Sequence, residues 1–303
     1  MTFAKIRMET IYYEHVPGGY GQIRYNPLLL ANVTNTQLEE WFLNYKYLHF
    51  LLNKDTEEEF AQYKLPVEFE YSMRTRSRSF QELADHSKIL IDQSLFQDLF
   101  RVMVSTLEKA NEMIEITNLK KVGCSIEDFK VEIKKKVKAF HKKPFPEKVK
   151  KFEVEEGFKE YLEALKAVNK ARNCFEHRNG VLGKEDCNSG DKLVMNCRYP
   201  APVGRDNKPI EILDRMPLGE HYRCEFVETK LKYRISEKLK MGFVDSYKLI
   251  YTINFALKGI VDDIYRKCSF DEQIWIIKQF KCEQDAGHNK TGHNKTDKLP
   301  RRN

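Results

Sequence analysis

Three side chains within six residues, Arg172, Asn173 and His177, carry the groups that an RNA-cleaving site needs. An arginine is a permanent cation whose planar guanidinium matches phosphate oxygens. An asparagine amide can orient a neighbouring group, and a histidine can exchange a proton near neutral pH. In RNA cleavage the ribose 2′-hydroxyl attacks the adjacent phosphate, so the nucleophile belongs to the substrate and no metal is needed to supply it.

The helical pattern of residues 157–178 indicates how Arg172 is positioned. At 100° per residue, one side of this helix collects four apolar residues, namely Tyr161, Leu165, Val168 and Phe175. Arg172 falls near the middle of that stripe. Because an unpaired buried charge is strongly unfavourable, its guanidinium must pair with an acid or face an interface or cleft.

The end of the same helix positions the other two groups. Asn173 and His177 are four residues apart and share a neighbouring face. The pair Asn179-Gly180 is a C-terminal stop signal, so His177 lies in the last turn. Exposed carbonyls and the helix dipole favour a protonated imidazole there, which suits a general acid or base.

The run ARNCFEHRNG, residues 171–180, resembles the R-x4–6-H motif of the HEPN superfamily (higher eukaryotes and prokaryotes nucleotide-binding domain). In that family a polar residue, often asparagine, follows the arginine, as Asn173 does here. The resemblance implies an antiparallel helical bundle that dimerises so that two motifs meet in one cleft. It also implies catalytic roles for Arg172 and His177, with Asn173 positioning the site.

Many members of this family are ribonucleases of toxin–antitoxin and antiviral defence systems, so the resemblance implies RNA as substrate. We therefore expect a metal-independent endoribonuclease that leaves a 2′,3′-cyclic phosphate and acts as a homodimer without a cofactor. An antitoxin or a sensing protein is an implied partner. The alternatives are a non-catalytic helical module that binds RNA or protein, and a regulatory partner in a bacterial defence operon.

Two other interpretations of these residues remain open. Arg172 could pair with an acid of a neighbouring helix, such as Glu112 or Glu115, while His177 merely caps carbonyls. Two pairs, Cys174-x2-His177 and His221-x2-Cys224, contain enough ligands for a tetrahedral zinc ion. The pairs are more than forty residues apart and contain no C-x2-C knuckle, so we expect no metal site.

A lysine-rich segment, residues 134–151, holds nine lysines against one acid, Glu147. Clustered lysines supply the sequence-independent part of nucleic-acid affinity. The candidate RNA contacts are Lys134, Lys135, Lys136, Lys142, Lys143 and, from the motif helix, Arg178. The alternative is a solvated loop between helices, because Pro144 and Pro146 interrupt helical structure.

The remaining pattern predicts a mainly α fold, an antiparallel helical bundle of HEPN type with a small β excursion. We expect an N-terminal segment of irregular or short-strand structure over 1–35, a helical domain over 36–280 that starts after an Asn35-Thr36 cap, and a disordered tail over 281–303 with a tandem GHNKT repeat. Helices are predicted at about 79–119, 126–140, 156–178, 243–266 and 271–280. Alternating apolar residues predict a β-rich insertion at about 192–235.

Composition favours a soluble cytoplasmic protein. The chain has 303 residues, of which 41% are hydrophobic and 32% charged, with a net charge of +7. No apolar run approaches the roughly 20 residues that span a bilayer, and the first residues do not resemble a signal peptide. Seven scattered cysteines fit a reducing compartment better than a disulfide framework.

Overall fold

The computed structural model describes residues 11–16, 20–25, 27–54, 58, 79–120, 126–152, 156–203, 223–267 and 278–281. This part of the chain is mainly helical, with one antiparallel hairpin and one small three-stranded sheet. The mainly α class and the β excursion expected from the sequence are therefore confirmed.

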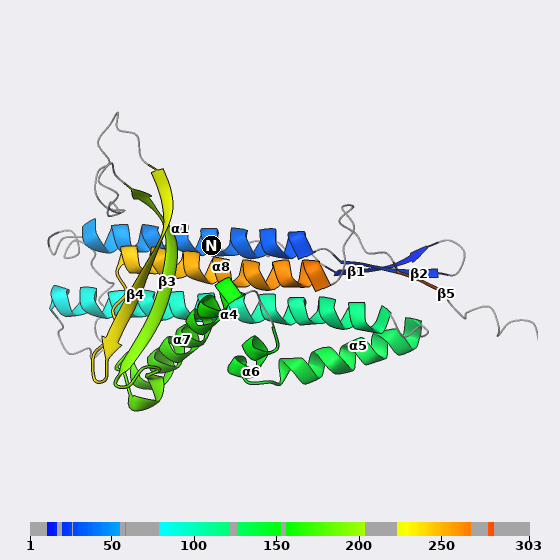
Figure 1. The fold of residues 1–303 in the computed structure, drawn as a ribbon. Coiled ribbons are helices and arrows are strands. Elements are labelled where there is room, and N and C mark those ends of the chain that lie inside the picture. Colours follow the sequence, from blue (N-terminus) through cyan, green and yellow to red (C-terminus); the bar gives the residue numbers. More distant parts are fainter. Residues whose placement is uncertain are drawn as a thin grey trace, which may run out of the picture.

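Three long helices form the main layer: α1 (Pro27–Lys54), α4 (Phe80–Lys120) and α8 (Phe243–Lys267). Figure 1 shows them side by side, with α1 running opposite to the other two. The hydroxyls of Thr34 and Thr106 lie 2.9 Å apart between α1 and α4. Between α1 and α8, the Asn254 amide donates to the Asn35 carbonyl oxygen at 2.7 Å. These polar contacts fix the register of the layer.

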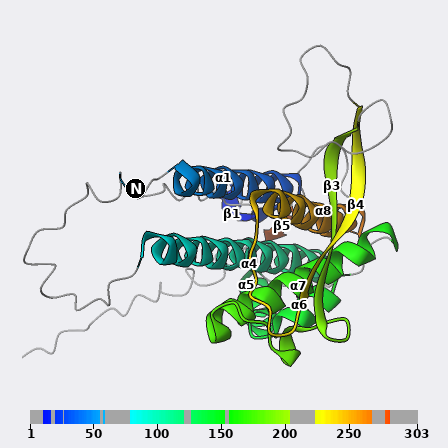
Figure 2. The ribbon, with the colours of Figure 1, turned by 90° about the vertical axis from the view of Figure 1, so that its left-hand side faces the viewer.

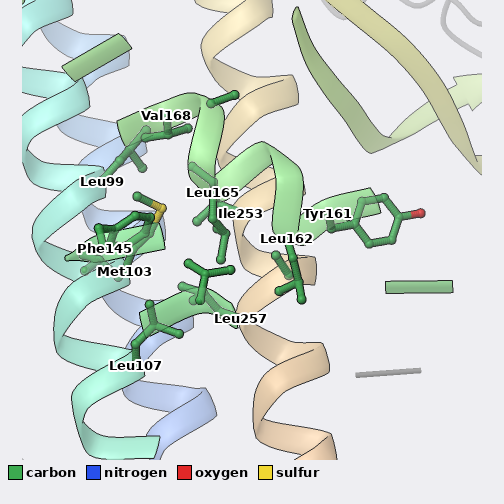
Figure 3. Close-up of a cluster of buried hydrophobic side chains, with 14 of the residues drawn as sticks. Leu99, Met103, Leu107, Phe145, Tyr161, Leu162, Leu165, Val168, Ile253 and Leu257 are labelled. Atoms are coloured by element: carbon green, nitrogen blue, oxygen red, sulfur yellow. The ribbon is translucent and has the colours of Figure 1, made fainter. Parts of the chain in front are cut away.

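The motif helix α7 (Glu156–Arg178) packs against both α4 and α8. Its residues Leu165 and Val168 are fully buried and meet Leu99 and Met103 of α4 and Ile253 of α8 (Figure 3). The apolar stripe predicted from the sequence is confirmed: Tyr161, Leu165, Val168 and Phe175 are all buried. Helices α5 (Ile126–His141) and α6 (Phe145–Lys150) cover another side of α4.

The β excursion is an antiparallel hairpin of two twelve-residue strands, β3 (Lys192–Val203) and β4 (Arg223–Arg234). Alternate β3 side chains are buried against α7 and α8, while β4 is largely exposed. The 3-10 helix η1 (Lys184–Asp186) lies between α7 and this hairpin in the sequence. A second sheet, in the order β1 (Ile11–Val16), β2 (Tyr20–Tyr25), β5 (Lys278–Lys281), adjoins the end of the helical layer where α1 begins (Figure 1).

Two boundary predictions are wrong. The short strands expected within residues 1–35 are present at 11–16 and 20–25, but α1 begins at Pro27 and not after Asn35-Thr36. Proline at a first helical position fixes φ and lacks an N–H that would stay unpaired. The side chain of Asn35 does not cap a helix; it donates to Glu39 one turn later, at 2.7 Å.

The helix predicted at 271–280 is wrong for its last residues, because Lys278–Lys281 pairs as a strand with β2. Its partner strand lies more than 250 residues earlier, so local periodicity does not report the pairing. Residues 271–277 and the tail 282–303 lie outside the described residues. The predicted helices at 79–119, 126–140, 156–178 and 243–266 are confirmed within two residues.

Candidate functional site

The last turn of α7 is held in place by the residues that end it and by the turn that follows β4. Asn179 and Gly180 have φ of 50° and 81°, and the Gly180 N–H donates to the Cys174 carbonyl at 3.2 Å. The Leu239 N–H then donates to the Gly180 carbonyl at 2.7 Å, and the Leu182 N–H to the carbonyl of Glu237 at 3.0 Å. This fixes the backbone that carries the motif.

Arg172 lies at the edge of the apolar stripe, with its side chain 27% exposed. Its guanidinium carbon is 4.5 Å from the centre of the Phe100 ring of α4, a cation–π distance. Nη2 lies 2.6 Å from Oε1 of Glu176, and Nη1 donates to the Asn173 Oδ1 at 3.2 Å. Arg172 and Asn173 are therefore in direct contact.

The acid beside Arg172 is Glu176 of the same helix, not Glu112 or Glu115. Glu112 pairs with Lys109 at 2.9 Å. Glu115 accepts from two lysines, Lys136 at 2.9 Å and Lys151 at 2.6 Å, and these bonds hold the pKa of its carboxyl below the ordinary value although burial acts in the opposite direction. The proposed partners of the alternative interpretation are thus wrong, although an ion pair to Arg172 exists.

His177 is exposed on the last turn of α7. Within the described residues its imidazole makes no hydrogen bond or ion pair, so no carbonyl there is capped by it. His177 comes five positions after Arg172 in the helix. Five steps of 100° place the two side chains about 140° apart around the helix axis. A single copy of the chain therefore does not bring Arg172 and His177 together.

A groove of about 350 Å³ adjoins the ring that supports Arg172. It lies between α4 and α5 and is lined by Phe100, Arg101, Val104, Ser105, Glu108, Lys109, Glu112 and Val137. The sequence reasoning missed Phe100 because it precedes Arg172 by 72 residues. The local spacing around the motif contains no signal for that contact.

The lysine segment divides into docking lysines and exposed ones. Three lysines bind acids of α4 and fasten α5 and α6 to it: Lys136 and Lys151 contact Glu115, and the buried Lys148 lies 2.5 Å from Glu108. Lys135 pairs weakly with Glu132 at 3.5 Å. Lys134, Lys142 and Lys143 are exposed and have no ion-pair partner in the described part of the chain, so they form the basic surface available to a ligand.

The guanidinium of Arg178, the sixth candidate RNA contact, already forms ion pairs with two carboxylates. Its Nη1 lies 2.6 Å from Oε1 of Glu185, and its Nε donates to Oδ2 of the buried Asp186 at 3.1 Å. The Gly183 N–H donates to that same Asp186 oxygen at 2.9 Å. Arg178 therefore fastens η1 to the end of α7.

The zinc alternative depends on Cys174 and His177. Cys174 is fully buried, and burial, with a smaller effect from the Asp186 carboxylate, raises the pKa of its thiol to about 12. A thiol ligand must lose its proton to bind zinc, so this environment opposes zinc binding. His221 lies outside the described residues, and within them no group of three or more His, Cys, Asp or Glu side chains could hold a metal ion.

No family model, curated protein or solved structure matches this chain. Function therefore has to be argued from the site itself. In the described part of the chain, none of the helices has a stretch both long and apolar enough to cross a membrane.

Proposed function

We propose that this chain is a metal-independent endoribonuclease of HEPN type that works as a homodimer. The observation that carries the proposal is the arrangement of Arg172 and His177 on the last two turns of α7. Arg172 is a partly exposed cation held over an aromatic ring, and His177 is an exposed imidazole without a partner among the described residues. Because the two side chains lie about 140° apart around the helix axis, we infer that the arginine of one copy meets the histidine of the other.

The proposed reaction is transesterification at the RNA backbone. The 2′-oxygen forms a bond to phosphorus while the bond from phosphorus to the 5′-oxygen breaks, leaving a 2′,3′-cyclic phosphate. His177 takes the proton of the 2′-hydroxyl, and a water molecule gives one to the departing 5′-oxygen. Arg172 stabilises the negative charge on the non-bridging oxygens.

Arg172 has to exchange Glu176 for phosphate in this scheme. An ion pair between residues four apart on a partly exposed helix is worth only about 0.3–0.5 kcal/mol. A phosphate can accept two hydrogen bonds from the guanidinium and carries more charge. The Phe100 ring holds the guanidinium in place during the exchange, and Asn173 stays within hydrogen-bond distance of it.

The groove between α4 and α5 gives the RNA strand a path to Arg172. Phe100 offers a ring face or edge for a base, and Arg101 and Lys109 offer partly exposed cations. Helix α5 contributes Val137 to the wall. The exposed Lys134, Lys142 and Lys143 on and after this helix would extend the electrostatic attraction.

Two exposed apolar side chains support a self-contact at the end of α7. Val181 and Ile235 are both exposed, on two turns joined by the hydrogen bond from the Leu182 N–H to the Glu237 carbonyl. A two-fold interface uses the same patch on both copies, so these side chains would meet their equivalents beside the two motifs.

An enzyme that cleaves cellular RNA also needs to be inhibited until it is required, so the proposal includes an antitoxin or a sensing partner in a bacterial cytoplasm.

The test is an RNA cleavage assay in excess EDTA with purified full-length chain and its His177→Ala variant. His86→Ala, at an exposed histidine of α4, is the matched control. We expect wild type and control to produce 2′,3′-cyclic phosphate ends, and His177→Ala to be slower by at least about 100-fold. Undiminished cleavage by His177→Ala would refute the proposal, and no cleavage by any of them would favour the non-catalytic binding module.

A further inference from the structure

A second cavity, of about 410 Å³, is lined by residues of α1, α8 and the β3–β4 hairpin. Figure 2 shows how these elements are arranged. It shares no lining residue with the groove beside Arg172. Its size falls within the roughly 300–1,000 Å³ of small-molecule sites. Its floor is apolar, formed by Leu257 and Val261 of α8 and Ala31 of α1. The polar and aromatic groups around that floor define what it would bind.

Aromatic side chains form one wall. Phe226 of β4 stands edge-on to Phe255 of α8, with ring centres 4.8 Å apart, and Tyr251 lies one turn before Phe255. Phe226 remains 52% exposed although it lines the cavity. An exposed ring beside a cavity suits a flat heterocycle, because nucleic-acid bases stack on aromatic side chains.

An oriented amide faces the same cavity. One hydrogen of the Asn254 Nδ2 is donated to Asn35 Oδ1 at 2.7 Å, and Asn35 in turn donates to Glu39 at 2.7 Å. These bonds fix the orientation of Asn254, and leave its Oδ1 and its second amide hydrogen for a ligand. An asparagine amide matches an adenine edge, accepting from N6 and donating to N7.

One cation and one carboxylate complete the lining. Lys258 is exposed, and its ammonium has no ion-pair partner within the described residues. Asp262, one turn later on α8, is half-exposed. A single lysine suits a single phosphate, and a carboxylate suits the two hydroxyls of a ribose.

We propose that this cavity binds an adenine mononucleotide. The base stacks on Phe226 and is recognised by Asn254, the ribose hydroxyls reach Asp262 and the phosphate reaches Lys258. The site is independent of RNA cleavage, because none of its residues belongs to the motif helix.

The first test is calorimetric titration of the full-length chain with AMP, with IMP and with inorganic phosphate. IMP replaces the N6 amine by an oxygen and so cannot donate to Asn254. We expect AMP to bind at least about tenfold more tightly than IMP, and inorganic phosphate alone not to bind. Absence of AMP binding, or equal affinity for IMP, would overturn the proposal.

Variants then locate the binding. Phe226→Ala removes the stacking ring, and Phe50→Ala is its matched control because both rings are 52% exposed. We expect Phe226→Ala to weaken AMP binding at least about tenfold and Phe50→Ala to leave it unchanged. Lys258→Gln, at an exposed position that does not endanger folding, should weaken AMP but not adenosine. Unchanged AMP affinity in Phe226→Ala and Lys258→Gln would place the nucleotide elsewhere and contradict the assignment.

Discussion

At the scale of single residues, the environment of Arg172 is the most specific feature of the candidate site. Its guanidinium touches a ring of α4, a carboxylate of its own helix and the amide of Asn173. A flat, forked cation suits all three contacts at once, whereas a lysine ammonium is a point charge that cannot stack in the same way. The side chain is thus shaped for phosphate as well as for its present partners.

Arg172→Lys should therefore lower RNA cleavage by about 100-fold although the charge is kept, because the bidentate contact to phosphate is lost. The measurement is the initial cleavage rate in excess EDTA. Arg223→Lys, at a 66% exposed arginine of β4, is the control and should cleave at the wild-type rate. Equal rates for both variants would show that the guanidinium has no catalytic part.

A buried carboxyl joins the three long helices away from the site. The Tyr45 hydroxyl of α1 lies 2.7 Å from Asp92 Oδ1 of α4, and the Met241 N–H, just before α8, donates to Asp92 Oδ2 at 2.9 Å. Burial raises the pKa of Asp92 from 3.8 to about 6, although both hydrogen bonds favour the carboxylate. The Asp92 carboxyl has a higher pKa in the folded state than in the unfolded state. The stability that this carboxyl contributes is therefore complete below pH 3.8 and is lost as the pH rises through 6.

We expect Asp92→Asn to remove this pH dependence. The asparagine Oδ1 can accept from the Met241 N–H, and its Nδ2 can donate to the Tyr45 oxygen, whose own hydrogen then goes to the Met241 carbonyl 3.0 Å away. Between pH 4 and pH 8 the variant should gain up to about 3 kcal/mol of unfolding free energy relative to wild type. Urea unfolding of the variant and of wild type at the two pH values measures their unfolding free energies. If the two proteins differ by the same amount at both pH values, Asp92 does not cause the pH dependence.

At the scale of elements, the site depends on how α7 ends. A Cβ built on Gly180 would lie 2.8 Å from Cε1 of Phe175, whose ring is 2% exposed and packs on Phe96. The positive φ of Gly180 adds backbone strain for any other residue. The ring cannot move aside cheaply, so this glycine keeps the last turn of α7 against the core.

Gly180→Ala should therefore destabilise the protein by about 2–4 kcal/mol, combining strain with overpacking. Gly190 is the matched control, because its φ is 61° and nothing lies within 4 Å of an added Cβ. Gly190→Ala should cost only the strain, about 1 kcal/mol. Thermal unfolding of the two variants measures this, and equal losses would mean that the Phe175 contact does not matter.

Helices and strands could be predicted from the sequence where neighbouring residues determine them. The helical spacing of residues 156–178 and the stop at Asn179-Gly180 gave both the bounds of α7 and its buried face. The pairing of β5 with β2 and the contact of Phe100 with Arg172 join distant parts of the chain, so no local pattern contains them. The sequence does not distinguish Glu176, at helical spacing from Arg172, from acids of neighbouring helices, because either can pair with a partly buried arginine.

At the scale of the whole molecule, one copy of the chain displays both halves of the proposed site but does not join them. Arg172 rests on α4, while His177 points about 140° away around α7. The proposed chemistry therefore requires a dimer. We propose that its interface lies at the end of α7, beside Val181 and Ile235.

The most direct measurement of this claim mixes two inactive variants, Arg172→Ala and His177→Ala, under conditions where subunits exchange, and assays RNA cleavage in excess EDTA. If the site takes Arg172 from one copy and His177 from the other, each mixed dimer has one intact arginine–histidine pair. We expect the mixture to recover up to about a quarter of the wild-type rate, since about half of the dimers are mixed and each has one such pair out of two. A mixture that stays as inactive as each variant alone, while wild type cleaves, would contradict the composite site.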